Sequence, residues 1–552
     1  MIERSAAKVC ASYLLIALFA ASCATTEQAS NRIDKIFSNK EIAACQDLVL
    51  LPSLTIIKAE VVEKSIRVPA HCYVKGQISQ SITWHAQLPA RRNWSGRLVH
   101  QGDGGSDGHL GFRPDPHTDS WVRFGDVVAN SNSGHDAGIG PNWALHNRQA
   151  EVDFGYRAVH LTVAAAKTLI EAYYRRAPDF VYHVGCSNGG RQGLMAAQRF
   201  PADFDGIVAG APSIFRANNF YHHLKLMQHV HRNDMAANPG WDGDGNGLPD
   251  SLAKIEMLHE AVLAHCDEAD GIRDRVIDDP TQCDFDTDDF LERHACSDGV
   301  DGAACFTREQ SAYVRHLYDG SRNAAGELVY PGVNFGSEYL WDRFIPIEGN
   351  DMTPYVLRSI IRVFQSMFDE DPGIAPANVI DVSQTVKSNG AVPEWAWWDY
   401  DPEQIFDDSR EMSRLIDATD PDLHRFLVEN DGKLLIYQGW DEPYHASATL
   451  LDYVDDIVEA TFGGDRVAAG DNLRVFMMPG VQHCFFGPGP DLWERFEPVK
   501  QWNESGQPPA AIVTRKKPFD LVTNERLLCP WPQQARYTGP AEQQNEPANW
   551  VA

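Results

Sequence analysis

A serine framed by glycines, at the end of an apolar run, constrains this chain more than any other feature. The stretch "VYHVGCSNGGRQG", residues 181–193, places Ser187 between Gly185 and Gly189. Glycine permits the tight strand-to-helix turn that lifts a serine hydroxyl above a sheet edge. The N-terminus of the following helix offers N–H groups to a developing oxyanion. The pattern therefore predicts a nucleophile elbow rather than an ordinary glycine-rich turn.

Strands alternating with helices surround this turn. We expect strands at 81–90, 97–105, 179–185 and 204–212, a helix at 150–176 and another at 191–200. Two further strands are expected at 433–443 and 473–484. Such alternation is typical of an α/β fold with a mostly parallel sheet flanked by helices.

Between residues 213 and 430 the regular alternation of strands and helices stops, and Pro, Asp, Gly and Trp cluster. At 552 residues the chain is long for one compact domain. We therefore predict a signal peptide over 1–23, a first core segment over 24–212, an inserted domain over 213–430, and a second core segment with a polar tail over 431–552.

The start of the chain resembles an export signal. "MIERSAAKVCASYLLIALFAASC" combines a weakly basic start, an apolar run too short to span a bilayer and a small-residue end. Its "AASC" is similar to a lipoprotein box, so both a lipid anchor at Cys23 and ordinary cleavage into a secreted or periplasmic protein stay open. A net charge of −29 without a basic stripe argues against nucleic acid as a partner.

Eleven cysteines occur, of which nine follow the signal segment. In an exported chain such residues favour disulfides, although spacing alone does not give their connectivity. The pairs that would close the shortest loops are Cys45 with Cys72, Cys266 with Cys283, and Cys296 with Cys305.

A serine nucleophile needs a base, and the base needs an orienting carboxylate. On this kind of sheet the chain order is Ser, acid, His at successive strand ends. His483 lies in the last strand-end loop, and Asp441 and Glu442 lie in the loop before it.

Two cysteines that the local pairs leave over are each adjacent to a candidate catalytic residue. Cys186 precedes Ser187 and Cys484 follows His483. We expect these thiols to form a disulfide that closes a loop of about 300 residues and ties the serine loop to the histidine loop.

These pieces resemble the tannase/feruloyl esterase family. The matching motifs are "DFGYRAVHLT", "GCSNGGRQGLMAAQRFPADFDGIVAGAP", "CDEADGIRDRVIDDP", "YQGWDEP" and "MPGVQHC", spread from about residue 95 to 530. The resemblance implies an α/β-hydrolase core, a large lid inserted before the acid strand, a structural calcium site in that lid, and hydrolysis of small-molecule aromatic esters.

The resemblance carries over residue by residue. It makes Ser187 the nucleophile and His483 the base, and its Gly-x-x-Asp-Pro motif aligns Glu442 with the acid, leaving Asp441 as the alternative. The N–H groups of Asn188 and of Gly104, in the loop "HQGDGGSDG", are the expected oxyanion donors. Where relatives often have two bridged cysteines in the tail, only Cys529 occurs here, so it is either a free thiol or an unexpected partner.

The acidic loop 266–283 spaces its carboxylates three and four residues apart, as hard-oxygen calcium loops do. The resemblance implies that Ca²⁺ is held by these side chains and backbone carbonyls: Asp267, Asp270 and Asp274, with Ile272 and Val276.

Three further interpretations stay open. "DGDGNGLPD", 242–250, is either a second calcium loop or a Gly/Asp turn, and Trp395, Trp397 and Trp398 either line an aromatic pocket or belong to the core. The alternative to an esterase is a non-catalytic, calcium-stabilised surface lipoprotein that binds phenolic or polysaccharide ligands. Neither the particular ester nor the oligomeric state follows from the sequence.

Overall fold

The computed structural model describes residues 37–65, 68–110, 121–137, 143–144, 147–232, 237–240, 251–343, 345, 400–516, 524–540, 543 and 546–551. These residues form two compact units that interleave along the chain. Unit 1 comprises residues within 1–100, 110–131 and 161–181, and unit 2 comprises residues within 101–109, 132–160 and 182–552.

Unit 1 is built on strands in the spatial order β1-β2-β3-β5-β4. β4 and β5 are parallel, whereas the other neighbours are antiparallel. A capping box, in which the side chains of Ser38 and Glu41 each bond the other's backbone N–H, starts α2. The bounds are α2 Asn39–Gln46, β1 Thr55–Val62, β2 His71–Ile78, β3 Ile82–Leu88, β4 Arg97–Gln101 and β5 Val127–Ser131.

Unit 2 carries four parallel strands in the order β6-β7-β10-β11. The apolar runs of these strands are buried, as expected where helices flank both faces of a parallel sheet. The bounds are β6 Phe180–Cys186, α5 Asn188–Arg199, β7 Gly206–Gly210, β10 Lys433–Gly439, α14 Ser447–Phe462, α15 Arg466–Ala469, β11 Leu473–Met478 and α16 Glu497–Ser505. The predicted α/β class is confirmed.

The helix predicted over 150–176 is present in three consecutive pieces. They are α3 Arg148–Val152, a π-helical turn at Asp153–Arg157 and α4 Ala158–Tyr174. The sequence pattern thus predicted the helix but gave no sign of the π-helical turn.

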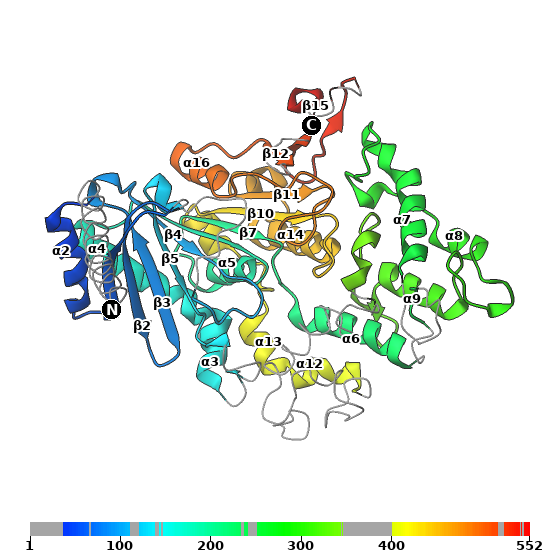
Figure 1. Cartoon of the computed structure of the whole chain (residues 1–552), viewed down its shortest axis with the longest axis horizontal. Helices are drawn as coiled ribbons and strands as arrows, with labels where there is room; N and C mark the ends of the chain where they lie inside the picture. The colour runs from blue at the N-terminus through cyan, green and yellow to red at the C-terminus, as the bar shows by residue number, and fades with distance from the viewer. Residues whose placement is uncertain are drawn as a thin grey trace, which may run out of the picture. The chain divides into compact units, whose positions relative to one another are not determined.

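The described part of the segment between β7 and β10 is mainly helical, as Figure 1 shows in green and yellow. Buried residues from it, among them Tyr221, Leu258, Tyr313 and Trp341, share one hydrophobic cluster. The bounds are α6 Arg216–Arg232, α7 Ala253–Cys266, α8 Thr287–Arg293, α9 Arg308–Asp319, β8 Ser321–Arg322, β9 Leu328–Tyr330, α12 Ile405–Asp408 and α13 Arg410–Ile416. The domain limits 213 and 430 themselves stay predictions.

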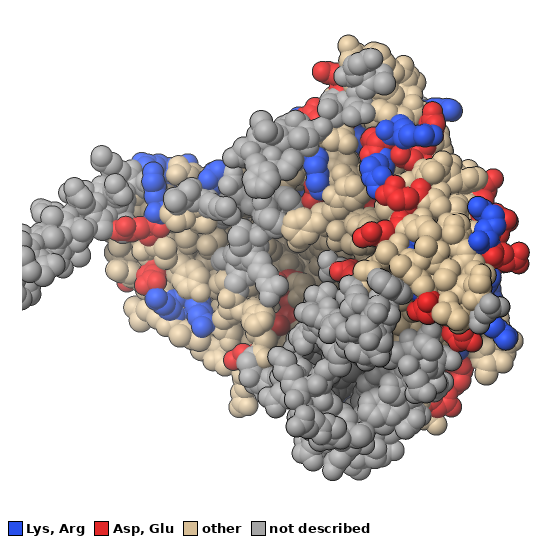
Figure 2. All heavy atoms as spheres, turned by 45° about the vertical axis from the view of Figure 1, so that its right-hand side comes forward, with Lys and Arg blue, Asp and Glu red and all other residues tan. Residues whose placement is uncertain are grey.

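The C-terminal tail forms two small antiparallel pairs, β12 Ile512–Lys516 with β13 Asn524–Leu528 and β14 Arg536–Tyr537 with β15 Trp550–Val551. Figure 2 shows Lys and Arg side chains interspersed with Asp and Glu on one face. Exposed ion pairs, such as Arg275–Glu260 at 2.6 Å, each contribute little to the stability of the fold. Within the described ranges, no helix is both long enough and apolar enough to cross a bilayer.

Candidate active site

The predicted strand, turn and helix around Ser187 are present. β6 ends at Cys186, α5 begins at Asn188, and Ser187 between them has φ 63° and ψ −121°. A Cβ on Gly185 would lie 2.6 Å from the backbone of Gly189, so glycine is required for this sharp a turn. Ser187 therefore occupies a strained backbone position at the strand end, the geometry of a nucleophile elbow.

The loops after β10 and β11 stay paired beyond the ends of both strands. The N–H of Trp440 donates to the carbonyl of Met478 at 2.9 Å, and that of Asp441 donates to the carbonyl of Val481 at 3.1 Å. A Cβ on Gly439 would lie 1.9 Å from the Val481 oxygen, so this close approach needs glycine. The pairing brings the acid loop alongside the loop that carries His483.

Glu442 is the carboxylate that meets His483. The imidazole Nδ1 lies 2.6 Å from Glu442 Oε2, and the side chain of Glu442 is fully buried while that of His483 is 20% exposed. The other oxygen, Oε1, accepts the N–H groups of Tyr444 at 2.8 Å and His445 at 3.3 Å. A carboxylate held this firmly can orient the imidazole and stabilise its protonated form.

Asp441 faces elsewhere. Its Oδ2 accepts the Tyr339 hydroxyl at 3.0 Å. Burial, reinforced by Glu338, holds the pKa of Asp441 well above its usual value. The hydrogen bond from the Asp441 N–H to the Val481 carbonyl fixes the backbone of this turn next to the histidine loop. Of the two acids that the sequence left open, only Glu442 contacts His483.

The expected disulfide between Cys186 and Cys484 is present, with an S–S distance of 2.05 Å and Cα atoms 6.0 Å apart. Its half-cystines directly flank Ser187 and His483, so the bond holds the two loops together. Cys484 has φ 65°, and its carbonyl accepts a hydrogen bond from Arg495 at 2.8 Å. The histidine loop is thus fixed both covalently and by hydrogen bonds.

A buried polar network lies beneath the elbow. The Asn188 amide donates to Asp107 Oδ2 at 3.0 Å, and its oxygen accepts from Arg191 at 2.7 Å and from Arg216 at 2.9 Å. Asp107 also accepts from Gln192 at 2.6 Å, and burial raises the pKa of Asp107 to about 7. This network fixes the first residue of α5. No sequence motif indicates this network, because its members are separated by up to about a hundred residues.

The glycine-rich loop predicted to supply an oxyanion donor lies against α5. A Cβ on Gly189 would lie 2.9 Å from the carbonyl carbon of Gly102, which shows the close backbone approach. The N–H of Gly104 donates to Asp103 Oδ1 at 3.1 Å. The roles of Asn188 and Gly104 as oxyanion donors stay predictions.

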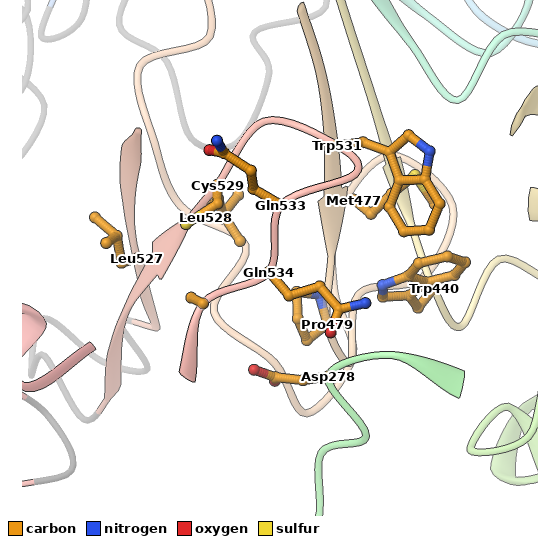
Figure 3. A pocket seen from close by; sticks show the side chains of 11 residues that line it. Asp278, Trp440, Met477, Pro479, Leu527, Leu528, Cys529, Trp531, Gln533 and Gln534 are labelled. Atoms are coloured by element: carbon orange, nitrogen blue, oxygen red, sulfur yellow. The ribbon is translucent and has the colours of Figure 1, made fainter. Parts of the chain in front are cut away.

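The three local disulfides are also present: Cys45–Cys72, Cys266–Cys283 and Cys296–Cys305. Cys529 is a buried free thiol, and burial raises its pKa. It lines a small pocket with Trp440, Met477 and Trp531, shown in Figure 3. Its raised pKa and burial are typical of a structural thiol rather than a reactive one.

The acidic loop is folded around Asp267. Its carboxylate accepts the N–H groups of Arg275 at 2.9 Å and Val276 at 3.1 Å, while Asp270 Oδ1 accepts that of Ile272 at 3.0 Å. Asp274 pairs with the guanidinium of Arg526, on β13, at 2.5 Å. Within the described residues, no three His, Cys, Asp or Glu side chains are grouped as a metal site.

The chemistry of this loop nevertheless fits a hard cation. Arg526 also pairs with Asp278, and its guanidinium lies 3.7 Å from Asp270. Together with Asp274, three carboxylates therefore share one guanidinium. Burial and the neighbouring carboxylates raise the pKa values of Asp270 and Asp278. The raised pKa values show that these carboxylates are poorly compensated by Arg526 alone, and oxygen is the donor type that Ca²⁺ prefers.

Some predictions lie outside the described residues. They are the signal segment with Cys23, the loop 242–250, and the tryptophans Trp395, Trp397 and Trp398.

The parallel sheet, the elbow at Ser187 and the buried Glu442–His483 pair define a hydrolase of the α/β class. Its fold is similar to that of the crystal structure of feruloyl esterase B from Aspergillus oryzae, with a TM-score of 0.74, 21% identity, and coverage of 93% of this chain and 99% of that one.

A family model described as tannase and feruloyl esterase matches residues 64–548. The chain belongs to this family and is a carboxylic-ester hydrolase. It is 28% identical to an uncharacterized esterase of Xanthomonas campestris, over 90% of this chain and 89% of the relative. It is 26% identical to the mono(2-hydroxyethyl) terephthalate hydrolase of Piscinibacter sakaiensis, over 85% of this chain and 83% of the relative.

Proposed function

We propose that the protein hydrolyses small-molecule esters of aromatic or phenolic acids through an acyl-enzyme formed on Ser187. The observation that carries the proposal is the 2.6 Å contact of His483 Nδ1 with buried Glu442, in a loop that a disulfide ties to the serine elbow. The family match and the terephthalate and feruloyl esterase relatives support the aromatic acyl group.

The proposed mechanism follows from these contacts. With Nδ1 engaged by Glu442, Nε2 of His483 is the atom that takes the proton as Ser187 Oγ attacks the ester carbonyl. The oxyanion is stabilised by the N–H groups of Asn188 and Gly104. To do so, the Gly104 N–H gives up its hydrogen bond to Asp103 Oδ1 and donates to the substrate oxygen instead. His483 returns the proton to the departing alcohol, and a water molecule that it then activates releases the acid and restores Ser187.

Replacing the nucleophile tests the mechanism. We expect Ser187→Ala to lower kcat on a chromogenic phenolic ester by on the order of 10⁴-fold or more, because the acyl-enzyme cannot form. The variant keeps the circular dichroism spectrum and melting temperature of the parent protein. The parent, but not the variant, is labelled by a fluorophosphonate probe. Undiminished hydrolysis by Ser187→Ala would refute the proposal.

Substrate choice is assigned to residues 213–430, which we propose act as the lid between core segments 24–212 and 431–552. Kinetics on matched methyl esters of gallic and ferulic acid, on chlorogenate and on the mono-ester of terephthalic acid would identify the acyl group. Equal kcat/KM on acetate and butyrate esters would contradict an aromatic preference.

We also propose export, supported by four disulfides, which persist in oxidising compartments. Cell fractionation and mass analysis of the mature N-terminus would locate the protein and test the lipid anchor at Cys23.

A structural Ca²⁺ ion in the acidic loop completes the proposal. Its support is the excess of carboxylates over the single guanidinium of Arg526. The side chains of Asp267, Asp270 and Asp274, with the carbonyls of Ile272 and Val276, would hold the ion, which would supply charge compensation to the lid.

A further inference from the structure

We propose that Tyr339 and Asp441 are positioning residues of this esterase. The Tyr339 hydroxyl joins the acid loop to the histidine loop through Asp441 and Gln482, and Glu442 is the carboxylate that contacts His483. The inference rests on the proposed Ser187–His483–Glu442 mechanism.

The contacts of Tyr339 are the first observation. Its hydroxyl donates to Asp441 Oδ2 at 3.0 Å and is also hydrogen-bonded by the side chain of Gln482. Asp441 immediately precedes Glu442, and Gln482 immediately precedes His483. One hydroxyl thus connects the two positions from which the acid and the base project.

The segment that carries Tyr339 is itself anchored. Tyr339 is the second residue of the short 3₁₀ helix η10, Glu338–Arg343. The fully buried Glu338 carboxylate accepts the Tyr318 hydroxyl at 2.6 Å and contacts His259 Nδ1 at 2.7 Å. Just before this helix, the Asn334 amide donates to the carbonyl of Trp440 at 2.8 Å. The inserted segment therefore holds the acid loop at two successive residues.

The surroundings of Asp441 explain why its pKa is raised. Tyr339 and Glu338 face it from η10, Glu442 follows it on its own loop, and His483 lies beyond Glu442. The His259 imidazole is engaged by Glu338 rather than by Asp441. Burial is the largest influence on the pKa of Asp441 and raises it, Glu338 raises it further, and the Tyr339 hydrogen bond only partly opposes them.

This arrangement fixes the position of the acid loop. Because Tyr339 engages Asp441, that carboxylate is directed away from the imidazole that Glu442 contacts. The raised pKa of Asp441 favours its uncharged form, which limits the charge beside Glu442. Displacing an orienting acid by about 1 Å costs on the order of 10²-fold in rate, so the alignment of this loop matters.

Four variants test the proposal through kcat, KM and the pH profile of kcat. We expect Tyr339→Phe and Asp441→Ala each to lower kcat by about tenfold or more with KM changed by less than about twofold, since neither side chain is assigned to substrate binding. Asp441→Asn, which keeps an uncharged hydrogen-bonding group, retains kcat within about threefold of the parent. It also extends activity to higher pH, because asparagine cannot ionise. The control Tyr221→Phe removes another hydroxyl of the segment between β7 and β10, bonded to Glu403 and to the carbonyl of Arg322, and leaves both kcat and the pH profile unchanged.

Two results would overturn the inference. One is an Asp441→Asn loss as severe as that of Glu442→Gln, which would make Asp441 the charged orienting acid. The other is a Tyr339→Phe variant with the kcat and pH profile of the parent. If Asp441→Ala does not fold, the measurements on Asp441→Asn and Tyr339→Phe still test the inference. Failure of the proposed function itself is distinct, because it would show as hydrolysis by Ser187→Ala.

Discussion

Glu442 and Asp441 are consecutive in the chain and lie in different chemical environments. Glu442 accepts two backbone N–H groups and contacts the imidazole of His483. Asp441 accepts one phenol hydroxyl, which lowers its pKa, whereas burial and the nearby Glu338 carboxylate raise that pKa. Burial opposes ionisation and raises the pKa of Asp441, whereas the carboxylate of Glu442 is held in place by backbone N–H groups and by the imidazole of His483.

Asp441 gives a pH-dependent stability that asparagine removes. Its folded pKa is raised above the ordinary value of 3.8, so the native state keeps a proton that the unfolded chain releases. The residue's stabilisation is therefore fully present below pH 3.8 and is lost as pH rises through the folded pKa. We expect the melting temperature of Asp441→Asn, relative to the parent, to rise between pH 4 and pH 7. A difference that is constant over this range would contradict the raised pKa.

Among the secondary-structure elements, those with a local pattern were predictable. The strand–turn–helix around Ser187, the strands β10 and β11, and the cysteines beside the catalytic candidates all follow from short motifs. The choice of acid did not, because it depends on the pairing of Asp441 with Val481, which spacing does not reveal.

Apart from the Cys186–Cys484 disulfide, several contacts between distant parts of the chain had no sequence signal. Tyr339 lies 102 residues from Asp441, and Arg526 lies 252 residues from Asp274. Neither sits in a recognisable motif, and tyrosine and arginine have structural roles throughout any core. Such partners become visible only when tertiary packing brings them together.

The acidic loop and β13 carry the calcium prediction. We expect millimolar Ca²⁺ to raise the melting temperature and a chelator to lower it, because the ion would bind the folded loop and not the unfolded chain. Asp267→Asn should abolish the calcium response. Asp284→Asn is the matched control, since that carboxylate directly follows the acidic loop and is 95% exposed. A melting temperature that neither calcium nor chelator moves would indicate that Arg526 alone compensates the loop.

At the scale of the whole molecule, one covalent bond spans the inserted segment and fixes the active site. Cys186 and Cys484 are 298 residues apart in sequence, whereas Cys296 and Cys305 are 9 apart. On the loop-closure model, removing the longer crosslink costs about 3 kcal/mol more of the free energy of unfolding than removing the shorter one. This difference makes the short bridge a matched control for the long one.

We therefore expect the double variant Cys186→Ala/Cys484→Ala to be less stable to urea than Cys296→Ala/Cys305→Ala and to lose kcat as well. The loss of kcat follows because the serine and histidine loops are then held only by hydrogen bonds such as that of Arg495 to residue 484. Reductant should lower the kcat of the parent and leave that of Cys186→Ala/Cys484→Ala unchanged. Full activity with both thiols reduced would show that packing alone sets the distance between nucleophile and base.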